Sequence, residues 1–181
     1  MNRIILPLAA LAAFVPTLAG AAEFTLASKA LSDGIVSQQV SNTFGCAGGN
    51  VSPDLAWSGA PAGTKAFTLT LYDPDAPTGS GFWHWVVTDI PGDATRIAAA
   101  AGRDPAEMPP PARAMRNDAG MHAYLGPCPP EGAAPHRYVV TLTALGVDHL
   151  DLPDDASAAL VGFATGANAL GRAELTVTYG R

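Results

Sequence analysis

The sequence predicts a mostly β fold, an antiparallel two-sheet β-sandwich with a C-terminal helix and a long structured loop. Three observations indicate this fold class. Most segments with a regular hydrophobic pattern are strand-like, only one has the period of a helix, and 16 prolines and 19 glycines supply turns. The hydrophobic content of 48% and the charged content of 14% are typical of a folded domain.

The predicted strands are short segments rich in β-branched and aromatic residues. Along residues 66–72 the side chains alternate, and Phe67, Leu69 and Leu71 share one face. The later strands carry apolar side chains on both faces, which is expected inside a two-sheet sandwich. These later strands are residues 82–90, 137–145 and 174–179.

One helix is predicted after Pro153, where Asp154 or Asp155 can cap its first turn and Gly171 can end it. The helical period produces an apolar stripe, the kind of face that a helix normally turns toward a core. The stripe consists of Leu160, Phe163, Ala164, Ala167 and Leu170.

A long loop is predicted between residues 96 and 135, a segment rich in Pro, Gly and Ala. Its length excludes a tight hairpin, and a long structured loop in a compact domain usually carries function. The sequence has no internal repeat and no long linker. We therefore expect residues 22–181 to form a single domain.

Residues 1–21 have the pattern of a signal peptide. Arg3 supplies a positive charge, residues 4–18 are apolar and uncharged, and small residues precede the expected cleavage after Ala21 or Ala22. This pattern predicts a periplasmic or secreted protein. A retained membrane anchor is the alternative, which two prolines and the limited length of the apolar stretch disfavour.

The chain has two cysteines, Cys46 and Cys128. In an oxidising compartment an even number of cysteines favours a disulfide, and two free buried thiols are the alternative. A disulfide would join residues 44–50 to the proline-rich segment 126–132. That segment has few backbone donors and is suited to a stiff wall, although a purely structural crossover is also consistent with its composition.

The charge pattern argues against two classes of partner. The net charge is −6, the pI is near 4.9, and no run of Lys or Arg occurs, so nucleic acid is not an expected partner. No amphipathic basic helix suited to a membrane surface is present either, and stable membrane insertion is not expected after cleavage.

Four polar side chains lie near the ends of the predicted apolar strands. Asp73 follows residues 66–72 directly, His84 lies near the start of the next strand, and His136 and Tyr138 share one strand face. Each of them alone is typical of an ordinary turn or core. Together, imidazoles, a phenol and fixed loop amides suit a phosphate or carboxylate, with Asp73 orienting a histidine and favouring its protonated form.

Four ordered motifs resemble those of the phosphatidylethanolamine-binding proteins, and in particular their bacterial Raf-kinase-inhibitor-like branch. The resemblance covers residues 24 to 179, and residues 44–53 are also similar to bacterial members. The four motifs are Asp73-Pro74-Asp75-Ala76-Pro77, Gly81-Phe82-Trp83-His84-Trp85, Gly126 to Pro130, and His136-Arg137-Tyr138.

The resemblance implies a β-sandwich with a C-terminal helix and a surface pocket for phosphate, phosphorylated head groups or small anions. It assigns four residues to the pocket and three to positions near its rim. The pocket residues are Asp73, His84, His136 and Tyr138, and the rim residues are Pro77, Tyr124 and Gly126.

These observations favour an exported binding protein for a small anion or phosphorylated head group, with no catalysis, metal or cofactor expected. One alternative is a protein inhibitor that plugs the active site of a partner enzyme, as some members of the resembled family do. The other is a metal-dependent or acid–base hydrolase. No His-x-His or His-Glu-x-x-His spacing and no nucleophile-type turn supports that hydrolase.

Overall fold

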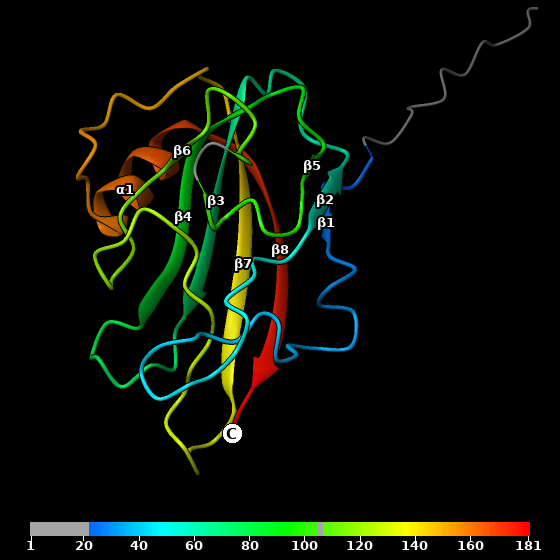
Figure 1. The fold of residues 1–181 in the computed structure, drawn as a ribbon. Coiled ribbons are helices and arrows are strands. Elements are labelled where there is room, and N and C mark those ends of the chain that lie inside the picture. Colours follow the sequence, from blue (N-terminus) through cyan, green and yellow to red (C-terminus); the bar gives the residue numbers. More distant parts are fainter. Residues whose placement is uncertain (1–21, 105–106) are drawn as a thin grey trace, which may run out of the picture.

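The computed structural model describes residues 22–104 and 107–181, which form two antiparallel sheets and one α-helix (Figure 1). The predicted fold class is confirmed, and the predicted signal peptide lies outside the described residues. The smaller sheet has the order β1-β2-β5 and the larger one β6-β4-β3-β7-β8. The strands of the smaller sheet are β1 (Thr25–Ala27), β2 (Leu55–Ser58) and β5 (Arg96–Ile97). Those of the larger sheet are β3 (Ala66–Asp73), β4 (Phe82–Pro91), β6 (Arg113–Ala114), β7 (His136–Leu145) and β8 (Ala169–Tyr179).

The register of the larger sheet decides where the polar side chains meet. Strand β3 is central and runs antiparallel to both β4 and β7. Asp73 at its end pairs with Phe82 at the start of β4, and Tyr72 pairs with Val139 near the start of β7. The end of β3 and the starts of β4 and β7 therefore lie at one edge of the sheet.

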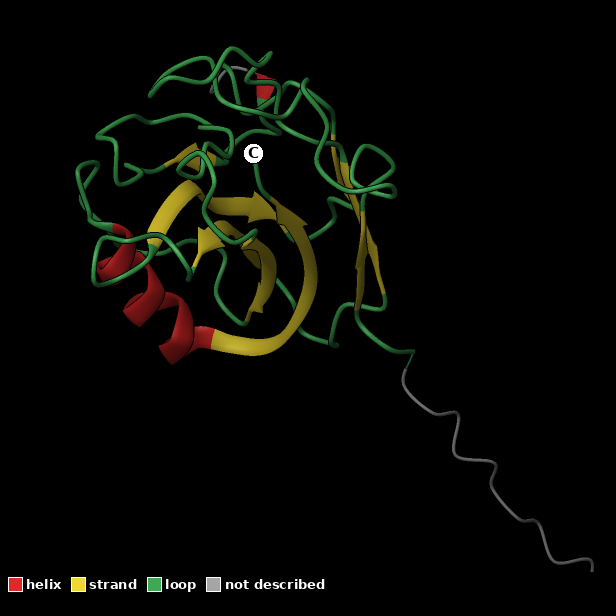
Figure 2. Cartoon of the chain, turned by 90° about the horizontal axis from the view of Figure 1, so that it is seen from below, coloured by secondary structure: helices red, strands yellow, loops and turns green. Residues whose placement is uncertain are grey.

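The central part of the larger sheet is buried on both faces, whereas its edge strand β8 is mostly exposed. The predicted face of Phe67, Leu69 and Leu71 belongs to the core that the smaller sheet covers, together with Trp57 of β2. The opposite face packs against α1 (Ala158–Asn168) through Val161 and its neighbours. Figure 2 shows the smaller sheet and the helix on opposite sides of the larger sheet. Burial on both faces explains why β4 lacks a simple alternating pattern, whereas β7 alternates over its first six residues.

The helix begins later than the sequence suggested. Ser157 is the N-cap, and its Oγ accepts a hydrogen bond from the backbone N–H of Leu160 at 3.3 Å. Asp154 instead accepts from the Arg113 guanidinium at 2.8 Å, and Asp155 is exposed. The prediction that Asp154 or Asp155 caps the helix was therefore wrong. An aspartate before a helix can bind another side chain or face solvent instead of accepting a hydrogen bond from the first turn.

The predicted apolar stripe was also wrong. Leu160 and Phe163 are 42% and 78% exposed, whereas Ala158, Val161 and Thr165 are the buried positions of the helix. The helix has no charged residue on any face, so hydrophobic periodicity could not show which face is buried. Small side chains lie against the sheet, where they allow a close approach, and Thr165 Oγ1 lies 3.2 Å from Thr68 Oγ1. The predicted end at Gly171 falls inside β8, which begins at Ala169.

Short strands and one buried amide fix described parts of the long segment between residues 96 and 135. It contains β5 and β6, which join the smaller and the larger sheet respectively. Asn117 donates from Nδ2 to the carbonyl oxygens of His84 and Ala123, and its Oδ1 accepts from the N–H groups of Ala119 and Met121. This side chain holds the loop to the start of β4.

Replacing Ser157 by Ala tests the position of the helix start. The substitution removes the acceptor for the first turn and is expected to lower the free energy of unfolding by about 1 kcal/mol. Asp155→Ala is the control, with an expected change of less than about 0.5 kcal/mol for an exposed side chain. Urea denaturation followed by circular dichroism measures both, and a larger loss in Asp155→Ala would contradict the assignment.

Candidate functional site

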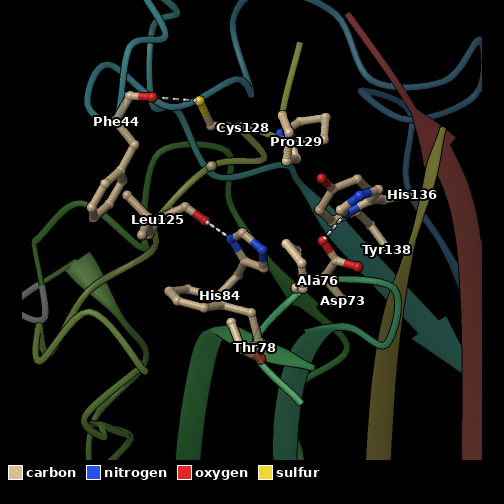
Figure 3. A pocket seen from close by; sticks show the side chains of 14 residues that line it. Phe44, Asp73, Ala76, Thr78, His84, Leu125, Cys128, Pro129, His136 and Tyr138 are labelled. Carbon is tan, nitrogen blue, oxygen red and sulfur yellow. Dashed lines mark hydrogen bonds and ion pairs between the residues drawn. The ribbon is translucent and has the colours of Figure 1, made fainter. Parts of the chain in front are cut away.

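A cavity of about 250 Å³ lies where β3 ends and β4 and β7 begin (Figure 3). It contains all of the sequence-predicted site residues except one. The predicted residues that line it are Asp73, Pro77, His84, Gly126, His136 and Tyr138. The remaining lining residues are Phe44, Ala76, Thr78, Phe82, Leu125, Cys128, Pro129 and Pro130.

Asp73 and His136 form a buried hydrogen-bonded pair. The two side chains come from positions 63 residues apart, and His136 Nδ1 lies 2.7 Å from Asp73 Oδ2. Since a carboxylate can only accept, Nδ1 carries the hydrogen and donates it. The other oxygen, Oδ1, accepts from the backbone N–H of Asp75 at 2.9 Å. Both oxygens of the buried carboxylate are therefore engaged, and the imidazole orientation is fixed.

An exposed ion pair ties the turn after β3 to the start of β7. Arg137 donates from Nε and a terminal nitrogen to the two oxygens of Asp75 at 2.9 and 2.8 Å, and its backbone N–H donates at 2.8 Å. These hydrogen bonds hold the pKa of the Asp75 carboxyl well below its usual range. The pair therefore stays charged through the physiological pH range and supports Asp73 from outside the cavity.

His84 has its two ring nitrogens in different surroundings. Nδ1 lies 2.9 Å from the carbonyl oxygen of Leu125 and donates to it. Burial lowers the pKa of His84, and the Leu125 carbonyl and the Asp73 charge only partly oppose this effect. At neutral pH the ring is accordingly neutral and its Nε2 is an acceptor. In Figure 3 this nitrogen lies on the side of the ring that faces Asp73 and Ala76.

Tyr138 brings a buried hydroxyl that has no hydrogen bond of good geometry among the described residues, although the Asp73 carboxylate is near enough to compete for its hydrogen. Burial, followed by the charge of Asp73, raises the pKa of the phenol, so the group remains a donor at all physiological pH values. Its ring meets that of His84 edge-on, with centroids 5.4 Å apart. A buried polar group without a partner normally carries a cost, which a ligand that accepts its hydrogen would remove.

Gly126 is held in the wall by close backbone packing. Its N–H donates to Asn50 Oδ1 at 2.7 Å, and the next residue, Pro127, accepts from Ser41 N–H at 3.0 Å. A Cβ at position 126 would lie 2.1 Å from the carbonyl oxygen of Gln39, which no real contact allows. The placement of Gly126 at the cavity thus depends on the absence of a side chain.

Tyr124 does not lie at the rim, contrary to the expectation from the sequence. The residue is 2% exposed, its ring packs edge-on against Trp85, and its hydroxyl donates to the carbonyl oxygen of Gln39 at 2.8 Å. A large apolar ring with a partner for its hydroxyl is stable in the core. Leu125 lines the cavity instead.

The predicted disulfide is present between Cys46 and Cys128, whose Cα atoms are 6.0 Å apart. Cys128 lines the cavity, so the bond fixes the proline-rich wall to the segment that carries Phe44. Arg181 adds two hydrogen bonds, from Nε to the carbonyl oxygen of Pro129 at 2.7 Å and from a terminal nitrogen to that of Gly45 at 3.2 Å. The wall is therefore held by covalent and polar links together.

Phe44 is the site residue that the sequence reasoning missed. It lines the cavity although it is 69% exposed, and its backbone has a φ of 55°, which is uncommon for a residue with a bulky side chain. The signals in the sequence were its position two residues before Cys46 and the glycine that follows it. Neither signal indicates on its own that the ring points toward a cavity.

Residues 22–104 and 107–181 lack two features that would point to other classes of site. These residues contain no group of three or more His, Cys, Asp or Glu side chains that could hold a metal ion. Within the same ranges, no helix has the length and hydrophobicity needed to cross a bilayer.

The fold and the cavity define a two-sheet β-sandwich with a small pocket at the ends of its central strands. The sequence profile described as phosphatidylethanolamine-binding protein matches residues 28–180. The UPF0098 protein YbcL of Escherichia coli (strain K12) is 44% identical over 170 residues, which cover 92% of this chain and 93% of YbcL. The crystal structure of E. coli YbcL matches with a TM-score of 0.85 and covers 88% of this chain and 99% of that chain.

A further relative is LppC of Mycobacterium tuberculosis, which is named as a lipoprotein. It is 39% identical over 165 residues, which cover 90% of this chain and 76% of LppC. These comparisons show that the chain belongs to the phosphatidylethanolamine-binding protein family. The family resemblance of the four sequence motifs is confirmed.

Replacing Gly126 by Ala is expected to disturb the wall of the cavity. The new Cβ must push the backbone near Gln39 away, which should lower the free energy of unfolding by about 1–3 kcal/mol. Gly162→Ala is the matched control, because no atom lies within 4 Å of a Cβ at that helical position and stability should rise by up to about 1 kcal/mol. Thermal unfolding distinguishes the two, and equal melting temperatures would refute the close packing.

Removal of the disulfide should lower stability without unfolding the sheets. The bond spans 82 residues, and its replacement by Cys46→Ser with Cys128→Ser is expected to cost about 2–4 kcal/mol through a less constrained unfolded state. Denaturant unfolding of the oxidised protein and the double variant measures this loss. Thiol titration of the native protein should find no free thiol, and two titrating thiols would overturn the assignment.

Proposed function

We propose that this protein is an exported binding protein whose cavity receives a small anion or a phosphorylated head group without turnover. The observation that supports the proposal is the hydroxyl of Tyr138, a buried donor at the cavity that has no hydrogen bond of good geometry among the described residues and lies near the His136–Asp73 pair. An anion oxygen in this cavity would accept that hydrogen bond.

The His136–Asp73 pair prepares the cavity for an anion in two ways. Both oxygens of Asp73 accept hydrogen bonds from the protein, which reduces the repulsion that a free carboxylate would exert on an anion. When His136 is protonated, the pair is neutral overall and both imidazole nitrogens are donors. The nitrogen that Asp73 does not engage can then donate to the ligand.

Binding without chemistry is supported by the nature of the lining groups. Cys128 is in the disulfide and has no thiol, and the hydroxyl of Thr78 donates to the carbonyl oxygen of Gly81. Neither is paired with a base as a catalytic nucleophile would be. The proline-rich wall and the two fixed histidines favour a preformed site, which reduces the ordering cost of binding.

Export is supported by three independent observations. Residues 1–21 have the pattern of a signal peptide, the two cysteines form a disulfide, and LppC is named as a lipoprotein. A disulfide at the cavity wall is suited to an oxidising compartment, where it persists. The ligand would accordingly be found in the periplasm or outside the cell.

Replacing His136 by Ala tests the role of the pair in anion binding. The variant should lose on the order of 1–3 kcal/mol of affinity for phosphate or glycerophosphoethanolamine, the value of a charge-assisted hydrogen bond. His149→Ala is the control, because His149 is an exposed histidine that does not line the cavity. Calorimetry measures the affinities, and thermal unfolding checks that both variants are folded.

The affinity of the wild-type protein for phosphate should decrease as the pH rises from 5 to 8. A deprotonated imidazole offers no positive charge to an anion, and His84 loses its charge below the usual histidine range because burial lowers its pKa. In the His84→Gln variant, the change in affinity near pH 5 should therefore be smaller than in the wild-type protein. Identical weak affinities for wild type and His136→Ala at every pH would mean that the four polar residues have only a structural role.

A further inference from the structure

The charge of the lining differs from that of a site built for a strongly charged anion. Among the described residues, the cavity is lined by no Lys or Arg, and its ionisable groups are Asp73, His84, His136 and Tyr138. Arg137, the cation nearest along the chain to these groups, points outward and is paired with Asp75. His84 is neutral at neutral pH. A second negative charge on a ligand would therefore meet no compensating Lys or Arg among the lining residues and would lie close to the Asp73 carboxylate.

The rim of the cavity is apolar. Phe44, Phe82 and Leu125 contribute apolar side chains to the lining, and Pro129 and Pro130 form the proline-rich wall. Figure 3 shows Phe44 and Leu125 on one side of the cavity and Asp73 with His136 on the other. If a ligand places an oxyanion near Tyr138 and His136, any substituent on that ligand must therefore contact apolar side chains.

Phe44 has an exposed aromatic ring and a disfavoured backbone conformation, and neither feature stabilises the fold. A large aromatic ring that is 69% exposed loses contact with the core, and a φ of 55° is disfavoured for it. The segment is nevertheless fixed, because Cys46 is bonded to Cys128 and Gly45 accepts from Arg181. The carbonyl oxygen of Phe44 itself lies 3.3 Å from Cys128 Sγ. A bound apolar group would cover part of the ring.

We propose that the cavity selects monoanions that carry an apolar substituent, and that Phe44 is the residue that determines this selectivity. This inference rests on the proposed function, since it concerns the ligand of the same cavity. The shared chemistry is a singly charged oxyanion next to a hydrocarbon group. A lipid-derived phosphodiester and a free organic carboxylate both offer it.

Three synthetic probes separate charge from hydrophobic contact. Dimethyl phosphate and methyl phenyl phosphate are both monoanions and differ only in the apolar group, whereas phenyl phosphate is mostly a dianion at pH 7.5 because its second pKa is near 6. Calorimetry on the oxidised full protein should show methyl phenyl phosphate binding about fivefold tighter than dimethyl phosphate, the value of an aromatic contact. It should also bind about fivefold tighter than phenyl phosphate, whose second charge is uncompensated.

Phe44→Ala should abolish the preference for the phenyl group, so that methyl phenyl phosphate and dimethyl phosphate bind with affinities within about twofold of each other. Phe163→Ala is the matched control, because Phe163 is 78% exposed on α1 and does not line the cavity. Phe44→Leu, which keeps an apolar side chain, should retain part of the preference. Unfolding curves and the absence of free thiols verify that each variant has the native wall.

The outcomes separate this inference from the proposed function. If none of the three probes binds, the proposed function fails together with the inference. Binding of all three with equal affinity, or tightest binding of phenyl phosphate, would overturn the inference and leave anion binding in place. A second comparison of acetate with phenylacetate decides between the two sources, since a preference limited to the phosphodiesters points to lipid-derived ligands.

Discussion

The hydrogen bond between Asp73 and His136 is the interaction on which the site depends. A carboxylate buried at the end of a central strand is costly unless its oxygens are satisfied, and here one imidazole and one backbone N–H satisfy them. The antiparallel register makes this possible, since it places the end of β3 beside the start of β7. The outer Asp75–Arg137 pair then restrains the same two segments from the solvent side.

The sequence predicted those parts of the site that strand geometry determines. Asp73, His84, His136 and Tyr138 lie at strand ends, and in antiparallel strands such ends meet at one edge of the sheet. Tyr124 and Phe44 were beyond this reasoning because they belong to loops. The direction of a loop side chain depends on contacts such as the one between the Tyr124 hydroxyl and Gln39, which are distant in sequence.

The prediction of the buried face of the helix was wrong for a different reason. Hydrophobic periodicity identifies a buried face only where another face is polar, and α1 has no charged residue to mark one. Packing was decided by size, so Ala158 and Val161 are buried while Phe163 is exposed. The four short strands β1, β2, β5 and β6 were not predicted either, since two to four residues are too few to show a period.

The cavity combines two kinds of structural support, and this division affects how such a protein can diverge. Its polar floor comes from strand ends that the whole sheet fixes, so substitutions there threaten the fold. Its rim includes the exposed side chain of Phe44 on a surface segment, where a side chain can change at little cost to stability. Evolution or protein engineering can therefore give one scaffold a series of ligand preferences by varying the rim, while the proton-bearing groups of the floor stay in place.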